Sequence, residues 1–203
     1  MELEVGEFLQ EITDAAGVSG FEGGVAALIR QVWEPLADDI RRDNMGSLMA
    51  RRGPRPGAGA GKSVRVMMAA HMDEIGLMVT KIEKGGFLRF APVGGFDRRV
   101  LPAQEVVVHG RESLPGVIGV KPPHLLSAEA YDKPYKPEDM YIDVGLSEEE
   151  AGRLVQVGDP ITMKGGFRRL QGEMAANKGM DDRAGVAVLH VCLQELACLQ
   201  HSH

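Results

Sequence analysis

Apolar residues recur at helical spacing near both ends of the chain. Residues 4–16 carry one such stripe, which predicts a helix. A second helix is predicted to follow Ser19, because Ser19 and Glu22 match the capping-box pattern and the apolar stripe continues to Trp33. A third helix is predicted over 182–199. Its apolar stripe consists of Val186, Leu189, Leu193 and Leu196.

Extended segments follow the second predicted helix. Residues 38–43 and 46–51 flank an Asn-Met-Gly turn and predict a hairpin. Residues 64–70 (VRVMMAA) form a continuous apolar run, which is typical of a strand covered on both faces in an α/β sheet. The stretch 53–61, rich in glycine and proline, is predicted to be a surface loop.

A β-rich block occupies residues 75–162. Its six short β-type segments alternate with glycine and proline turns, which predicts a small barrel or sandwich. The segments are 76–82, 87–91, 105–109, 116–120, 141–144 and 159–163. The polar excursion from Lys121 to Asp139 is predicted to be a long loop, and Ser147 is predicted to cap a short helix.

The order of these elements predicts two domains. Residues 1–72 and 166–203 would form an α/β domain, and residues 73–165 would be a β-rich domain inserted into it. The insertion separates two polar clusters, one at each of its ends. Such an arrangement would allow both ends of the host domain to meet at one site.

Composition excludes several classes of function. The net charge is −6, and only 5% of the residues are aromatic. A nucleic-acid groove needs a basic stripe, so no nucleic-acid partner is expected. No apolar run approaches the ~18 residues of a membrane span, and the acidic N-terminus does not match a signal peptide. We therefore expect a cytoplasmic protein without a membrane partner.

Two cysteines lie in the third predicted helix. Cys192 and Cys198 are six positions apart, which is a poor helical spacing for a bridge because their side chains project in different directions. Packing thiols in a reducing compartment are therefore favoured over a disulfide or a metal-binding pair.

The first polar cluster, His71-Met-Asp73-Glu74, directly follows the apolar run. Ligands commonly bind beyond the carboxyl end of a buried strand. There His71 could bind a metal through one ring nitrogen while Asp73 orients the ring. The alternative is a polar turn in which His71 and Asp73 bond backbone groups.

The second cluster, Asn177 to Gly185, contains adjacent aspartates just before the third predicted helix. Asp181 or Asp182 could simply cap that helix and interact with its dipole. Alternatively, Asp181 could bridge two metal ions while Asp182 and Arg183 hold its backbone in place, because two cations need an anionic ligand between them.

Four segments in this order (AAHMDEIGLMV, GGFDRRVLPAQ, KPPHLLS and NKGMDDRAGVAVL) resemble the glutamyl and deblocking aminopeptidases that assemble into tetrahedral particles. The resemblance covers essentially the whole chain. It implies a three-layer α/β metallopeptidase domain, incomplete at its C-terminal side, with an inserted small β-barrel or sandwich that serves for dimerisation. The implied partners are peptide substrates and further copies of the chain, a dimer being the building block of a dodecamer.

The resemblance also implies the chemistry of the site. His71 and Asp181 would be metal ligands, Asp181 bridging two zinc or cobalt ions, and Asp73 would be a catalytic residue that orients His71. The peptide between Asp181 and Asp182 would be cis. A water activated by both metals would attack the first peptide bond. The Lys121–Asp139 loop, with His124, would lie near an assembly contact or the mouth of the site.

Two alternatives remain open beside the aminopeptidase. The family's general-base glutamate and its further ligands, expected in a longer continuation, match no residue here, and His201 and His203 are interpreted as a helix end. The chain could therefore be an inactive assembly or interaction module of that family. An endoglucanase is the less favoured alternative, because one Trp and three Tyr supply few aromatic platforms for a sugar cleft.

Overall fold

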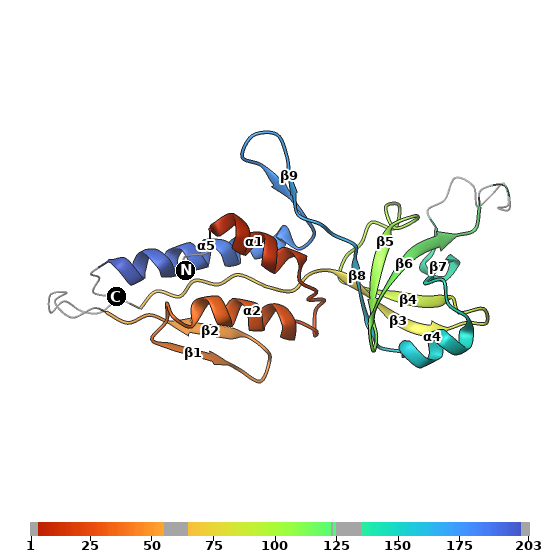
Figure 1. Cartoon of the computed structure of the whole chain (residues 1–203), viewed down its shortest axis with the longest axis horizontal. Helices are drawn as coiled ribbons and strands as arrows, with labels where there is room; N and C mark the ends of the chain where they lie inside the picture. Colours follow the sequence, from red (N-terminus) through yellow and green to blue (C-terminus); the bar gives the residue numbers. More distant parts are fainter. Residues whose placement is uncertain (1–3, 55–64, 123, 125–134, 200–203) are drawn as a thin grey trace. The chain divides into compact units, whose positions relative to one another are not determined.

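The computed structural model describes residues 4–54, 65–122, 124 and 135–199 (Figure 1). The chain divides into two compact units. The first, here called the helical unit, comprises residues 1–74 and 166–203. The second, here called the barrel unit, comprises residues 75–165.

The described part of the helical unit is built from three helices and two small hairpins. The helices are α1 (Val5–Asp14), α2 (Gly23–Trp33) and α5 (Met180–Cys198). The first hairpin pairs β1 (Asp39–Arg42) with β2 (Leu48–Arg51), as predicted, and the second pairs β9 (Arg168–Arg169) with β10 (Ala175–Ala176), which was not predicted. The three helices bury a common core that consists of Phe8, Ile12, Val25, Ile29, Trp33, Val186, Ala187 and Leu193.

The barrel unit is a closed six-stranded barrel rather than a sandwich. Its strands are β3 (Gly76–Ile82), β4 (Leu88–Val93), β5 (Glu105–His109), β6 (Ser113–Val120), β7 (Met140–Asp143) and β8 (Pro160–Met163). They close in the order β3-β4-β7-β6-β5-β8, and every pair is antiparallel. Alternate residues point inward, so pairs such as Val106 and Val108 fill the interior.

The barrel unit also contains a short helix and a 3-10 turn. The short helix α4 (Glu148–Leu154) begins at Ser147, where the predicted capping box is present in full. A 3-10 turn, η2, spans Pro137–Asp139. The rest of the predicted Lys121–Asp139 loop lies largely outside the described residues, although His124 is described and exposed. Among the described residues, no helix is both long and apolar enough to cross a membrane.

The prediction of a strand over 64–70 is wrong for residues 65–70, which are the part that the structure describes. Residues 65–70 belong to no strand, and Val66 and Met67 are 70% and 91% exposed. A strand needs a neighbour to bond its backbone, and the described part of the helical unit contains only two-stranded hairpins. The central sheet layer expected for a three-layer domain is therefore not formed there. The apolar run instead lines an open groove of about 920 Å³.

The predicted capping box at Ser19 is also wrong. Helix α2 begins at Gly23, and its N-cap residue, Glu22, makes no side-chain capping bond. The Ser19 hydroxyl instead donates a hydrogen bond to Asp73. A partner from a distant part of the sequence has therefore replaced the local one.

Acid is expected to weaken the helical unit through His190, which is buried in α5. Its ring lies 4.5 Å from that of Phe8, between ring centroids, and neither ring nitrogen has a hydrogen-bond partner. Burial therefore lowers the pKa of His190. Below about pH 6.5 the unfolded chain binds more protons at His190 than the folded chain does. The free energy of unfolding therefore decreases as the pH falls from about 6.5 toward the lowered pKa, by at most about 1.4 kcal/mol per pH unit, and His190 has no such effect above about pH 6.5.

The measurement is urea unfolding at several pH values, followed by fluorescence of Trp33, the single tryptophan, which is buried in this unit. His190→Leu should flatten the stability profile between pH 7.5 and 5. Other titrating groups are common to both proteins and cancel in the difference. Parallel profiles for the two proteins would contradict the assignment.

Candidate functional site

The structure brings together the three side chains that the sequence singled out. The Nδ1 atom of His71 lies 3.0 Å from Oδ1 of Asp73, and its Nε2 atom lies 3.0 Å from Oδ1 of Asp181. Asp181 is 110 residues away in sequence and reaches His71 from the start of α5. The imidazole is therefore held between two carboxylates. All three residues belong to the helical unit.

The two adjacent aspartates have different roles. Backbone angles are not helical at Asp181 or Asp182, so the regular turns of α5 begin at Arg183. Asp182 Oδ1 accepts a hydrogen bond of 3.1 Å from the Gly185 N–H, which makes Asp182 the N-cap of these turns. Asp181 does not serve as the cap, and its side chain is 96% exposed. The peptide between the two aspartates is cis, as the resemblance implied.

Gly185 is required for this arrangement. A Cβ atom at this position would overlap the Asp182 carboxylate. Only glycine therefore allows the cap to form at this distance, and the capped turn in turn fixes the backbone from which Asp181 projects.

The two contacts of His71 together need one more proton or cation than a neutral ring supplies, because a neutral imidazole carries a single N–H. A carboxylate only accepts hydrogen bonds, so Asp73 requires a hydrogen on Nδ1 of His71. In the neutral ring, the Nε2 lone pair would then face a second acceptor, Asp181. Burial alone would lower the pKa of His71, but the hydrogen bonds and charges of Asp181 and Asp73 outweigh it, and the pKa is raised. A proton or a metal cation satisfies both acceptors.

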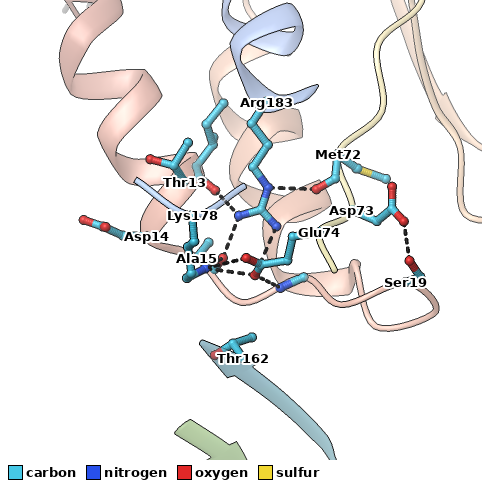
Figure 2. A network of polar contacts seen from close by, with 12 residues as sticks. Thr13, Asp14, Ala15, Ser19, Met72, Asp73, Glu74, Thr162, Lys178 and Arg183 are labelled. Carbon is cyan, nitrogen blue, oxygen red and sulfur yellow. Dashed lines mark hydrogen bonds and ion pairs between the residues drawn. The ribbon is translucent and has the colours of Figure 1, made fainter. Parts of the chain in front are cut away.

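Behind the site lies a buried charged network to which the sequence interpretation gave no role beyond Arg183 (Figure 2). Glu74 accepts hydrogen bonds of 2.8 and 3.1 Å from the Lys178 ammonium. Its Oε1 atom also lies 3.6 Å from Nη2 of Arg183. Arg183 is fully buried, and Glu74 is 5% exposed. We call these three residues the ionic clasp.

The clasp connects three segments of the helical unit, 12–15, 72–74 and 178–183. Arg183 donates to the backbone carbonyls of Ile12, Ala15 and Met72 at 2.6, 2.7 and 2.8 Å. Lys178 adds a bond of 2.9 Å to the Ala15 carbonyl. Glu74 lies three residues after His71, and Lys178 lies three residues before Asp181. The clasp therefore fixes both chain segments that carry the site.

Burial disfavours the charged forms of the two cations in the clasp. Desolvation lowers the pKa of Lys178, against the opposing effect of Glu74, and it likewise lowers the pKa of Arg183. Gly17 packs so closely on the Arg183 guanidinium that a Cβ atom would overlap it. In the sequence, the only available signal was the local grouping of charges around His71 and Asp181, which does not reveal that the two groups pair.

The donor set fits part of a divalent metal site. Adjacent ligand atoms about 2.0–2.1 Å from one ion lie roughly 2.9–3.4 Å apart for octahedral to tetrahedral angles. The 3.0 Å between Nε2 of His71 and Oδ1 of Asp181 falls in this range. Asp73 behind the ring matches the carboxylate–histidine arrangement of metal sites. Among the described residues, however, no group of three His, Cys, Asp or Glu is arranged to hold an ion.

Cys192, Cys198 and His109 do not belong to this group of three residues. Cys192 and Cys198 are free thiols, and Cys198 is exposed rather than packed. His109 is a strand residue of the barrel unit that bonds Thr162 at 2.9 Å. His201 and His203 lie outside the described residues.

Comparison with known proteins shows which family this chain is similar to. The family model described as M42 glutamyl aminopeptidase matches residues 48–203. The putative aminopeptidase FrvX of Escherichia coli is 34% identical over 93% of this chain and 52% of its own length. A TET aminopeptidase from a marine sediment archaeon (Thaumarchaeota) superposes with a TM-score of 0.85 at 37% identity, over 95% of this chain and 54% of that one.

The TET1 peptidase of Pyrococcus horikoshii, whose chains assemble into a tetrahedron or a large octahedral shell, gives a TM-score of 0.79 at 36% identity, over 97% of this chain and 57% of that one. The present chain thus spans about half the length of the relatives it matches. The family match covers more than half of the chain, and the solved structures reproduce its α/β elements and its barrel. The chain belongs to the M42 glutamyl aminopeptidase family.

Proposed function

We propose that this chain supplies His71 and Asp181 as metal ligands, with Asp73 as the residue that orients His71, to the active site of a metal-dependent aminopeptidase. The observation that carries the proposal is the 3.0 Å approach of the His71 Nε2 atom to the Asp181 carboxylate, with Asp73 on the opposite ring nitrogen. A neutral imidazole has one N–H for these two carboxylates, so when Nδ1–H donates to Asp73, the contact between Nε2 and Asp181 calls for a cation. A divalent metal meets this need, and the family membership makes an aminopeptidase its context.

The reaction is removal of the N-terminal residue from a peptide. His71 and Asp181 would hold divalent ions, zinc or cobalt, which when bound would supply Lewis-acid activation of a water and of the carbonyl of the first peptide bond. Asp181 would suit a position between two ions because its second oxygen accepts no hydrogen bond from the described residues and its side chain is almost fully exposed. Asp73 keeps the hydrogen on Nδ1 of His71, which leaves Nε2 available as a ligand. We assign the general base and the remaining ligands to no described residue of this chain.

We further propose that the barrel unit is the dimerisation domain of a larger homo-oligomer. The support is the match of 97% of this chain to the TET1 peptidase, whose own chains form closed shells. A closed barrel also leaves no free strand edge, so the contact would be made through its outer face. Light scattering after size-exclusion chromatography tests this proposal, and a strictly monomeric chain would contradict it.

Metal binding is the direct test of the function. The metal-free chain titrated with Zn²⁺ or Co²⁺ in a calorimeter is expected to bind, and His71→Ala should weaken this binding strongly. Aminoacyl p-nitroanilides should be hydrolysed only with metal present, and analogues with a blocked N-terminus should not.

A chain that binds neither ion and still forms oligomers would instead support the inactive assembly module. Cleavage of a soluble cellulose derivative would support the glycosidase.

A further inference from the structure

Ser19 lies in the loop between α1 and α2, and its side chain is used in an unexpected way. Its hydroxyl donates a hydrogen bond to Oδ2 of Asp73, which is 54 residues away in sequence. The start of α2, four residues after Ser19, has no side-chain cap. The serine that could have capped this helix is therefore committed to the candidate site (Figure 2).

The loop that carries Ser19 is fixed against the segment that carries Asp73. Val18 and Glu74 form a parallel bridge, with the Glu74 N–H donating to the Gly17 carbonyl at 2.8 Å. The Gly17 N–H donates to Oε1 of Glu74 at 3.1 Å, so side chain and backbone both hold the loop. The Ser19 hydroxyl is thus presented to Asp73 by a backbone that the ionic clasp immobilises.

Both oxygens of Asp73 are consequently occupied. Oδ2 accepts from Ser19, and Oδ1 accepts from Nδ1 of His71. A carboxylate held at both oxygens has a fixed plane, whereas one held at a single oxygen can rotate away from the ring. The result is an unbroken series of contacts from Ser19 through Asp73 and His71 to Asp181.

His71 has two competing ways of placing its hydrogen. A neutral ring can donate from Nδ1 to Asp73 or from Nε2 to Asp181, since each nitrogen lies 3.0 Å from a carboxylate. Only the first form leaves the Nε2 lone pair free for a metal. Whatever strengthens the hold of Asp73 on the ring therefore favours the form that binds metal.

We propose that Ser19 is a positioning residue of the metal site. It fixes the Asp73 carboxylate so that His71 keeps its hydrogen on Nδ1 and presents Nε2 to the ion. The part of this inference that concerns the ion rests on the proposed function, but the effect on the His71 ring does not.

The test uses the full chain and three variants. Ser19→Ala removes the donor, Ser19→Thr keeps a hydroxyl, and Ser147→Ala removes a serine cap from the barrel unit as a control. In the metal-free protein at alkaline pH, the ¹⁵N shifts of the His71 ring nitrogens report which nitrogen carries the hydrogen, and His71→Ala assigns the signals. Calorimetric titration with Zn²⁺ and with Co²⁺ gives the affinity of each variant.

Ser19→Ala is expected to shift the hydrogen of His71 toward Nε2 and to weaken metal binding about 10–100-fold, the range found when a residue behind a ligand is removed. Ser19→Thr should restore both properties, and Ser147→Ala should change neither. Unchanged tautomer and affinity in Ser19→Ala would overturn the inference.

If the wild-type chain bound neither Zn²⁺ nor Co²⁺, that result would contradict the proposed function and not the role of Ser19. In that case the tautomer measurement alone would test the role of Ser19. Movement of the His71 hydrogen toward Nε2 in Ser19→Ala would support the role, and an unchanged tautomer would overturn it.

Discussion

Replacing Asp181 with asparagine is expected to weaken Zn²⁺ and Co²⁺ binding by more than about 100-fold, beyond the range for residues that stand behind a ligand. The substitution keeps the shape of the side chain but removes the negative charge that faces Nε2 of His71 at 3.0 Å. An amide is a poor bridge between two cations because it carries no charge to offset their repulsion. Calorimetry of the metal-free chain measures the change.

Asp182→Asn is the matched control for this experiment. It removes the same charge one position away, and asparagine is as good an N-cap as aspartate, so the bond to the Gly185 N–H can persist. Metal affinity should stay within a few-fold of wild type. Equal losses in the two variants would mean that general negative charge, rather than the Asp181 side chain, attracts the ion.

Glu74→Gln is expected to destabilise the helical unit by about 3–5 kcal/mol, the usual effect of removing one partner of a buried ion pair. The substitution leaves the Lys178 ammonium and the buried Arg183 guanidinium without their shared counter-charge. Urea unfolding followed by Trp33 fluorescence reports this unit specifically, because Trp33 lies in α2.

Two further variants make this result interpretable. Adding Lys178→Met to Glu74→Gln should cost less than the sum of the single changes, because it removes a cation that has lost its partner. Glu83→Gln, which breaks ion pairs of the barrel unit with Lys81 and Arg89, should leave the Trp33 transition unmoved. Additive losses in the double variant would show that Glu74 and Lys178 do not act as a pair.

Several elements could be predicted because their signals are local. The six barrel segments alternate inward and outward residues between glycine and proline turns, and the pleat converts this alternation directly into strands. The capping box at Ser147 works for the same reason, since Ser147 and Glu150 are three residues apart and meet no competitor. At Ser19 an identical local pattern failed because Asp73 offered the hydroxyl a charged acceptor.

The run Val64–Ala70 shows a different limit. Its apolar, β-branched character indicates a propensity, but a strand exists only where another strand satisfies its backbone. Within the described residues no strand lies beside it, and residues 65–69 remain exposed. The β propensity is a property of the segment itself, whereas strand pairing depends on the chain that surrounds it.

The sequence by itself determined the helices, the barrel strands and the identity of the three residues that carry the candidate chemistry, His71, Asp73 and Asp181. Only the tertiary structure decided that Asp182, and not Asp181, is the N-cap of the regular turns of α5. It also decided that Ser19 and the ionic clasp hold together the chain segments that carry His71 and Asp181. The physical reason is the range of the interactions. Periodicity and capping act within a few residues, whereas charge pairing and burial act between groups that only folding brings together.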